Sequence, residues 1–107
     1  DAANKQHYEV KAAFYRLALG PRLKYSCGFW PNRNSTFEES EVAMLELYCE
    51  RAQLKDGLKI VDLGCGWGSL TLFLAEKYPN ASITCISNSA SQKVFIDNTC
   101  KVCVSSA

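Results

Sequence analysis

The stretch that decides the fold is residues 60–68, Ile60-Val61-Asp62-Leu63-Gly64-Cys65-Gly66-Trp67-Gly68. It begins as an apolar strand, delivers an acidic residue and then runs into three alternating glycines. Because glycine has no Cβ, such a loop can turn tightly and let a ligand approach its backbone. A glycine-rich loop signals a binding site mainly where it joins a strand to a helix, and that context is present here. The stretch therefore predicts a ligand site at the carboxyl end of a strand.

The segments that follow the loop extend it into an α/β pattern. Residues 58–63 predict a strand, 69–78 a helix, 82–86 a second strand and 89–98 another helix. Leu70, Phe73 and Leu74 form the apolar face of the first of these helices. This order is the opening of a doubly wound parallel sheet with right-handed crossovers. Two strands are expected, and a third forms only if residues 101–104 pair with them.

Two helices are expected before the sheet. Residues 8–19 predict a helix that ends at Gly20-Pro21, and a second helix starts at Thr36, which has capping-box spacing to Glu39. The expected apolar faces are Val10, Phe14 and Leu17 in the first helix, and Val42, Leu45, Cys49 and Ala52 in the second. The chain thus divides into an N-terminal helical segment (1–57), the start of an α/β domain (58–98) and a tail (99–107).

Composition limits the possible classes of protein. The chain has 107 residues, 48% of them apolar, and a net charge of +1, which fits one small folded domain and no nucleic-acid-binding arm. No run is long enough to span a membrane, and no signal peptide is visible. The chain has six cysteines, of which Cys49 lies in a helical pattern, Cys65 in the glycine loop and Cys85 in an apolar strand. Because the chain has core-type segments of its own, we expect no disulfide framework, reduced cysteines and a cytoplasmic protein. Cys100 and Cys103 form the one C-x-x-C pair, and with too few further ligands for zinc we expect no metal.

A dinucleotide is one candidate ligand for the glycine loop, but three features of the sequence disfavour it. A dinucleotide site needs a third glycine or alanine where this chain has Ser69. It also needs an acidic residue after the second strand, where this chain has Ser87 and Asn88. Asp62 places a carboxylate near the position that phosphates must take.

S-adenosylmethionine suits the same loop better, because it has no phosphate. Backbone carbonyls and Asp62 can receive its ammonium group, and Tyr25 or Trp67 can face its sulfonium cation. A third alternative is a turn that only packs a strand on a helix. The alternating glycines after Asp62 favour the ligand site over that alternative.

Several segments together resemble one family. They are Tyr25-Ser26-Cys27 before the second helix, MLELYCERAQLKDG at 44–57, residues 59–81, and Asn88-Ser89 with Gln92. The sequence is similar over about residues 6–98 to the S-adenosylmethionine-dependent methyltransferases of the coclaurine N-methyltransferase and cyclopropane-fatty-acid synthase family. The resemblance implies an incomplete Rossmann-like class I methyltransferase domain preceded by two helices, with S-adenosylmethionine as cofactor.

The resemblance also implies roles for nine residues in cofactor binding. Tyr25 and Ser26 match contacts of the methionine end, with the Ser26 hydroxyl donating to the carboxylate. The glycine loop and the end of the second strand supply the rest: Asp62, Gly64, Cys65 and Gly66 beside the loop, and Ser87, Asn88 and Gln92 around the ribose and adenine. The family pattern ends at about Asn98. In the family, the catalytic residues and the acceptor pocket belong to the part that follows this point, so no catalytic residue is expected here.

The activity implied is methyl transfer to an amine nitrogen, such as that of a benzylisoquinoline alkaloid. Transfer to a lipid alkene is the alternative within the family, and a non-catalytic truncated or spliced product is the alternative outside the enzymes. We expect these 107 residues to be inactive alone. Apolar surface left open beside a short parallel sheet also predicts marginal stability or self-association.

Overall fold

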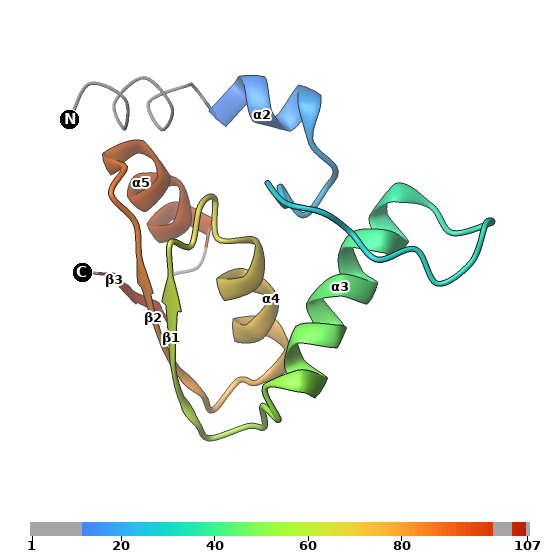
Figure 1. Ribbon diagram of the computed structural model, residues 1–107. Helices are drawn as coiled ribbons and strands as arrows, with labels where there is room; N and C mark the ends of the chain where they lie inside the picture. The colour runs from blue at the N-terminus through green and yellow to red at the C-terminus, as the bar shows by residue number, and fades with distance from the viewer. Residues whose placement is uncertain (1–11, 100–103, 107) are drawn as a thin grey trace.

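The computed structural model describes residues 12–99 and 104–106 (Figure 1). The helices and strands follow one another in the order α2 (Ala12–Ala18), α3 (Phe37–Arg51), β1 (Lys59–Leu63), α4 (Ser69–Lys77), β2 (Ser82–Ile86), α5 (Ala90–Thr99) and β3 (Val104–Ser106). The alternation of strand and helix predicted from residue 58 onward is confirmed. The predicted bounds of the strands and of the later helices differ from the observed ones by one residue at most.

The sheet is parallel and has the strand order β1-β2-β3. Leu63 at the end of β1 lies opposite Ile86 at the end of β2, so both strands end at the same edge, where the glycine loop begins. The described residues form three strands rather than the expected two. The third strand pairs with β2 from Val104 onward, within the segment expected to be a tail. Residues 101–103, which were considered for this strand, lie outside the described residues.

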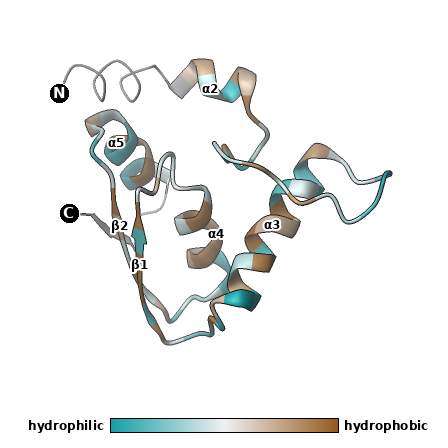
Figure 2. Cartoon of the chain, in the orientation of Figure 1, coloured by the Kyte–Doolittle hydropathy of each residue, from teal (hydrophilic) through white to brown (hydrophobic). Residues whose placement is uncertain are grey.

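The main core lies between the sheet and the two central helices. Figure 1 shows α4 between the sheet and α3. The buried core residues come from α3, α4, β2 and the turn before it: Leu45, Cys49, Phe73, Leu74, Ala81 and Ile83. In Figure 2, hydrophobic residues predominate in β2 and α4, whereas the tip of the loop before α3 is hydrophilic. The expected face of α4 is confirmed, with Leu70 packed at its margin.

Helix α3 starts with the predicted capping box. The backbone N–H of Glu39 donates to the Thr36 hydroxyl at 3.1 Å, and the Glu39 carboxylate accepts from the Thr36 N–H at 3.2 Å. Two otherwise unpaired N–H groups are thereby satisfied. The predicted apolar stripe was wrong at its last position, because Ala52 is the C-cap residue and is exposed.

The predicted apolar face of α2 was also wrong. Phe14 is 56% exposed and Leu17 is 90% exposed, whereas Tyr15 is 6% exposed. The helix turns Tyr15 toward Trp67, at 5.5 Å between ring centroids, and Trp67 in turn packs edge-on against Phe95 of α5. An aromatic cluster from distant parts of the chain therefore determines which face of α2 is buried. Val10, the third residue of the predicted face, lies outside the described residues.

One face of the sheet carries exposed apolar side chains. Val61 and Leu63 of β1 are 60% and 75% exposed, and alternate residues of the same strand are partly buried toward the helices. Among the described helices, none combines the length and the apolar character that a bilayer-spanning segment requires.

Candidate functional site

The three glycines of the loop all adopt left-handed backbone angles, with φ of +68° at Gly64, +57° at Gly66 and +82° at Gly68. Their surroundings differ. A Cβ on Gly68 would lie 2.8 Å from Ile96 Cγ1, so this glycine allows the loop to pack on α5. A Cβ on Gly64 or Gly66 would meet nothing within 4 Å. The first two glycines therefore leave open space above the end of β1, and the third serves packing.

Several amides of the loop are already used within the protein. The N–H groups of Gly64 and Cys65 both donate to the Ile86 carbonyl, at 2.9 and 3.1 Å. The Gly68 N–H donates to the Cys65 carbonyl at 3.0 Å. A pyrophosphate needs free N–H donors at such a loop. The hydrogen bonding thus supplies a structural argument against a dinucleotide.

The side chain of Asp62, in β1, bonds the first turn of α4. The Thr71 hydroxyl donates to Asp62 Oδ2 at 2.6 Å, and the Thr71 N–H also bonds this carboxylate. Burial raises the pKa of Asp62, and the bonds from Thr71 offset part of this rise. A built-in carboxylate at a helix N-terminus takes the position that an anionic ligand would use.

A cavity of about 570 Å³ lies above the carboxyl ends of β1 and β2. All nine residues predicted for cofactor binding line it: Tyr25, Ser26, Asp62, Gly64, Cys65, Gly66, Ser87, Asn88 and Gln92. They come from the loop before α3, from β1, from the glycine loop, from the segment after β2 and from the first turn of α5. The structure therefore brings these residues together around one space, and their contacts with a cofactor remain a prediction.

The end of β2 presents a network of hydroxyl and amide groups. The Ser87 hydroxyl donates to Gln92 Oε1 at 2.7 Å and accepts from the Ser89 N–H at 3.1 Å. The Gln92 N–H donates to the Ser89 hydroxyl at 3.4 Å, as its capping-box spacing suggests. Gln92 is thus held at the cavity wall while its backbone is capped. The arrangement places neutral polar groups where many nucleotide sites have a carboxylate.

Two aromatic side chains were candidates to face a sulfonium cation. Tyr25 is 52% exposed at the cavity, and its ring meets Tyr15 edge-on at 5.2 Å. Trp67 also lines the cavity but is 2% exposed, because it packs between Tyr15 and Phe95. Tyr25 is therefore the more accessible of the two. Trp67 serves mainly as core, although its buried Nε1 has no hydrogen-bond partner in the described part of the chain.

Sequence reasoning missed polar residues that line the same cavity. The most notable is Lys24, which is 5% exposed and contacts Tyr48 of α3. Ser69 lines the cavity too, and its buried hydroxyl is without a partner among the described residues. No spacing rule signals a buried lysine, because lysines are usually exposed. Only its position beside the Tyr25-Ser26 segment pointed to the site.

The remaining candidate ligands do not assemble into a metal site within the described residues. No group of three His, Cys, Asp or Glu side chains comes together there. The thiol of Cys65 lies beside that of Cys85, and burial raises the pKa of Cys65 to about 12. Cys100 and Cys103 lie outside the described residues.

The fold matches that of solved methyltransferases. A crystal structure of coclaurine N-methyltransferase bound to N-methylheliamine and SAH superposes with a TM-score of 0.95 at 42% identity, covering 97% of this chain and 31% of that one. The predicted fold class, an incomplete Rossmann-like class I methyltransferase domain preceded by helices, is confirmed.

The chain belongs to the mycolic acid cyclopropane synthetase family, whose model matches residues 1–104. It is 50% identical over 97 residues to (S)-coclaurine N-methyltransferase of Thalictrum flavum subsp. glaucum, covering 91% of this chain and 27% of that enzyme. It is 33% identical over 97 residues to cyclopropane-fatty-acyl-phospholipid synthase of Escherichia coli K12, covering 91% of this chain and 25% of that enzyme. The chain thus spans about a quarter of the length of these curated relatives.

Proposed function

We propose that the cavity binds S-adenosylmethionine and that the chain is the cofactor-binding part of a methyltransferase acting on an amine nitrogen. The observation that carries this proposal is the internal hydrogen bonding of the glycine loop. Its amides at Gly64, Cys65 and Gly68 are hydrogen-bonded internally, and Asp62 caps the helix start. The loop therefore suits a cationic, phosphate-free ligand better than a pyrophosphate.

The cavity fits such a cofactor on its own chemistry. Bare backbone at Gly64 and Gly66 leaves room beside the strand end, where any side chain would fill the space. A hydroxyl from Ser26 suits a carboxylate, and the Asp62 carboxylate suits an ammonium group. Ser87, Asn88 and Gln92 offer neutral hydrogen-bonding groups to ribose and adenine. S-adenosylmethionine supplies an electrophilic methyl group on a sulfonium.

The residues of this chain would contribute binding and orientation. Hydrogen bonds at both ends of the cavity hold a ligand in one pose, and reactions between oriented partners gain rate from this positioning. Tyr25, exposed at the cavity, offers its ring face to a cation. The acceptor nitrogen must offer a neutral lone pair, so methyl transfer requires a base that keeps this nitrogen unprotonated.

An amine acceptor is favoured over a lipid alkene by similarity. The N-methyltransferase relative is 50% identical and the lipid synthase relative 33% identical over equal lengths. A benzylisoquinoline amine is the acceptor class that we propose, with a phospholipid alkene as the second candidate.

Isothermal titration of the 107-residue chain tests the cofactor assignment. We expect S-adenosylhomocysteine to bind and NAD to bind more weakly or not at all. A double variant, Gly64→Val with Gly66→Val, serves as the control, since two valines fill the open space beside the loop. Tighter binding of NAD, or equal binding of S-adenosylhomocysteine by the double variant, would contradict the proposal.

Three further properties belong to the same proposal. The protein is cytoplasmic, which agrees with free thiols at Cys27, Cys49, Cys65 and Cys85. Residue 57 separates the helical segment from the start of the α/β domain. Two copies associate through the exposed apolar face at Val61 and Leu63, so Leu63→Ser should lower the mass measured by light scattering.

A further inference from the structure

Lys24 is a buried cation in the wall of the cavity. It lies in the loop between α2 and α3 and is 5% exposed. Its ammonium group donates to Ser26 Oγ at 2.6 Å, to the Cys27 carbonyl at 2.7 Å and to the Tyr48 hydroxyl at 3.3 Å. These three bonds use all three of its protons.

No carboxylate within the described residues forms an ion pair with the Lys24 ammonium. The ion pairs found there join Arg22 to Glu76, Lys77 to Glu46 and Lys93 to Asp97. The nearby Glu41 carboxylate accepts from the backbone N–H of Lys24 at 3.3 Å, and no ion pair joins it to the ammonium. Burying an unpaired charge is costly, so an anion in the adjacent cavity would be stabilising.

The bonds of Lys24 also fix the direction of two hydroxyl groups. An ammonium group has no lone pair, so the oxygens of Ser26 and Tyr48 must act as acceptors toward it. The proton of each hydroxyl is then left to donate elsewhere. Both residues line the cavity. Lys24 thereby turns two groups that can either donate or accept into donors that face the ligand space.

We propose that Lys24 is a positioning residue for the carboxylate of the bound cofactor. It orients the Ser26 and Tyr48 hydroxyls as donors and supplies a positive charge beside them. This inference rests on the proposed function, because it assigns the methionine end of S-adenosylmethionine to this side of the cavity. The Asp62 carboxylate, which lines the same cavity, is left for the ammonium group.

Two ligands that differ only in the carboxylate test the role of Lys24. S-adenosylhomocysteine carries it, and 5′-deoxy-5′-(3-aminopropylthio)adenosine has the same thioether and amine without it. Lys24→Met keeps the unbranched stem and removes the charge. We expect this variant to bind S-adenosylhomocysteine about tenfold more weakly, the scale of a lost charged hydrogen bond, and to bind the decarboxylated ligand within about twofold of the wild type, since that ligand has no group for Lys24 to serve.

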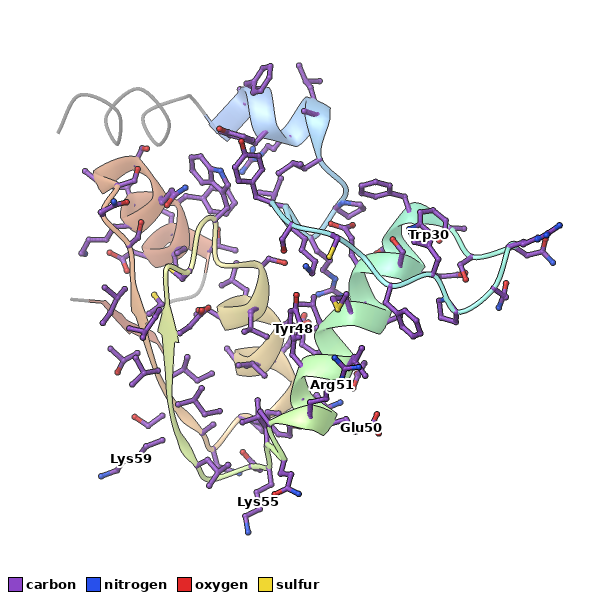
Figure 3. All side chains as sticks on the ribbon, in the orientation of Figure 1. Trp30, Tyr48, Glu50, Arg51, Lys55 and Lys59 are labelled. Atoms are coloured by element: carbon purple, nitrogen blue, oxygen red, sulfur yellow. The ribbon has the colours of Figure 1, made fainter. Side chains whose placement is uncertain are left out.

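Lys55→Met is the matched control. In Figure 3 the side chain of Lys55 lies at the lower end of the molecule and points outward. Tyr48, a partner of Lys24, lies between α3 and α4. The control should leave the affinity for both ligands unchanged. Lys24→Arg keeps a cationic donor and should preserve the preference for the carboxylate-bearing ligand. Equal losses for both ligands in Lys24→Met would indicate a merely structural lysine and overturn the proposal, as would no loss at all.

Two hydroxyl variants provide an independent test if Lys24→Met lowers the stability of the folded protein. Ser26→Ala and Tyr48→Phe leave Lys24 in place and remove the donors that it orients. Each should weaken S-adenosylhomocysteine and spare the decarboxylated ligand, and unselective or absent effects would contradict the proposal. If the wild type binds neither ligand, the proposed function fails. If the wild type binds and the variants show no selectivity, the cofactor assignment stands and the role of Lys24 is rejected.

Discussion

The Thr71 hydroxyl donates a 2.6 Å hydrogen bond to Asp62 Oδ2 and so ties the end of β1 to the first turn of α4. Thr71 is fully buried, and Asp62 is half-buried beside the cavity. The bond holds the carboxylate where it faces both the helix start and the ligand space. It therefore connects the packing of strand and helix to the charge of the site.

The pH dependence of folding should reveal the burial of Asp62. Its pKa is raised in the folded protein, chiefly by desolvation. Between the unfolded pKa, about 4, and the higher folded pKa, the folded state holds more protons. Stability contributed by this group is therefore present at low pH and lost as the pH rises. Urea unfolding at pH 3.5 and pH 7 measures this effect.

Asp62→Asn isolates that contribution, because Asn keeps an acceptor for Thr71 and does not titrate. We expect the stability of the variant relative to the wild type to increase from pH 3.5 to pH 7. Other carboxylates titrate in both proteins and cancel from the comparison. A relative stability that is constant or falls over this range would show that the pKa of Asp62 is not raised.

Gly66→Ala should weaken cofactor binding, whereas Gly57→Ala should not. Gly66 and Gly57 both have left-handed angles, φ +57° and +84°, and neither Cβ would meet an atom within 4 Å. Each alanine should therefore cost about 1–2 kcal/mol of backbone strain. Only the Cβ on Gly66 enters the cavity. Titration with S-adenosylhomocysteine should show a loss of about tenfold or more, the scale of overpacking, in Gly66→Ala and little change in Gly57→Ala.

Gly68→Ala should be the more damaging substitution for stability. Its φ of +82° matches that of Gly57, so the strain terms of the two alanine variants cancel. The difference that remains is the contact with Ile96, whose Cγ1 would lie 2.8 Å from the new Cβ. Urea unfolding should show Gly68→Ala less stable than Gly57→Ala by about 1–3 kcal/mol. Equal stabilities would mean that α5 moves away without cost.

The 107-residue chain should not transfer methyl groups by itself. It spans about a quarter of the relatives that carry out such reactions, and its cavity is formed by residues that suit the cofactor. A radiolabelled methyl-transfer assay with benzylisoquinoline amines and with phospholipids checks this expectation. Turnover above that of the Gly64→Val, Gly66→Val double variant would show that these residues suffice.

Local interactions made much of the fold predictable. The capping box of Thr36 with Glu39 spans three residues, and the strand and loop of residues 59–68 are contiguous, so their signals lie within short windows of sequence. The nine predicted site residues were grouped by family resemblance and by the rule that parallel strands end at one edge. These residues line one cavity because the carboxyl ends of β1 and β2 lie side by side at that edge.

Contacts between distant residues decided the rest. The sequence alone determined that a glycine loop with Asp62 joins a strand to a helix, because alternating glycines and apolar periodicity act locally. Only the tertiary structure decided that Tyr15 is buried while Leu17 is exposed, since that choice depends on Trp67 and Phe95 arriving from other elements. It also decided that Lys24 is buried. A lysine gives up its hydration only where a carbonyl and two hydroxyls, one of them from α3, replace the lost water.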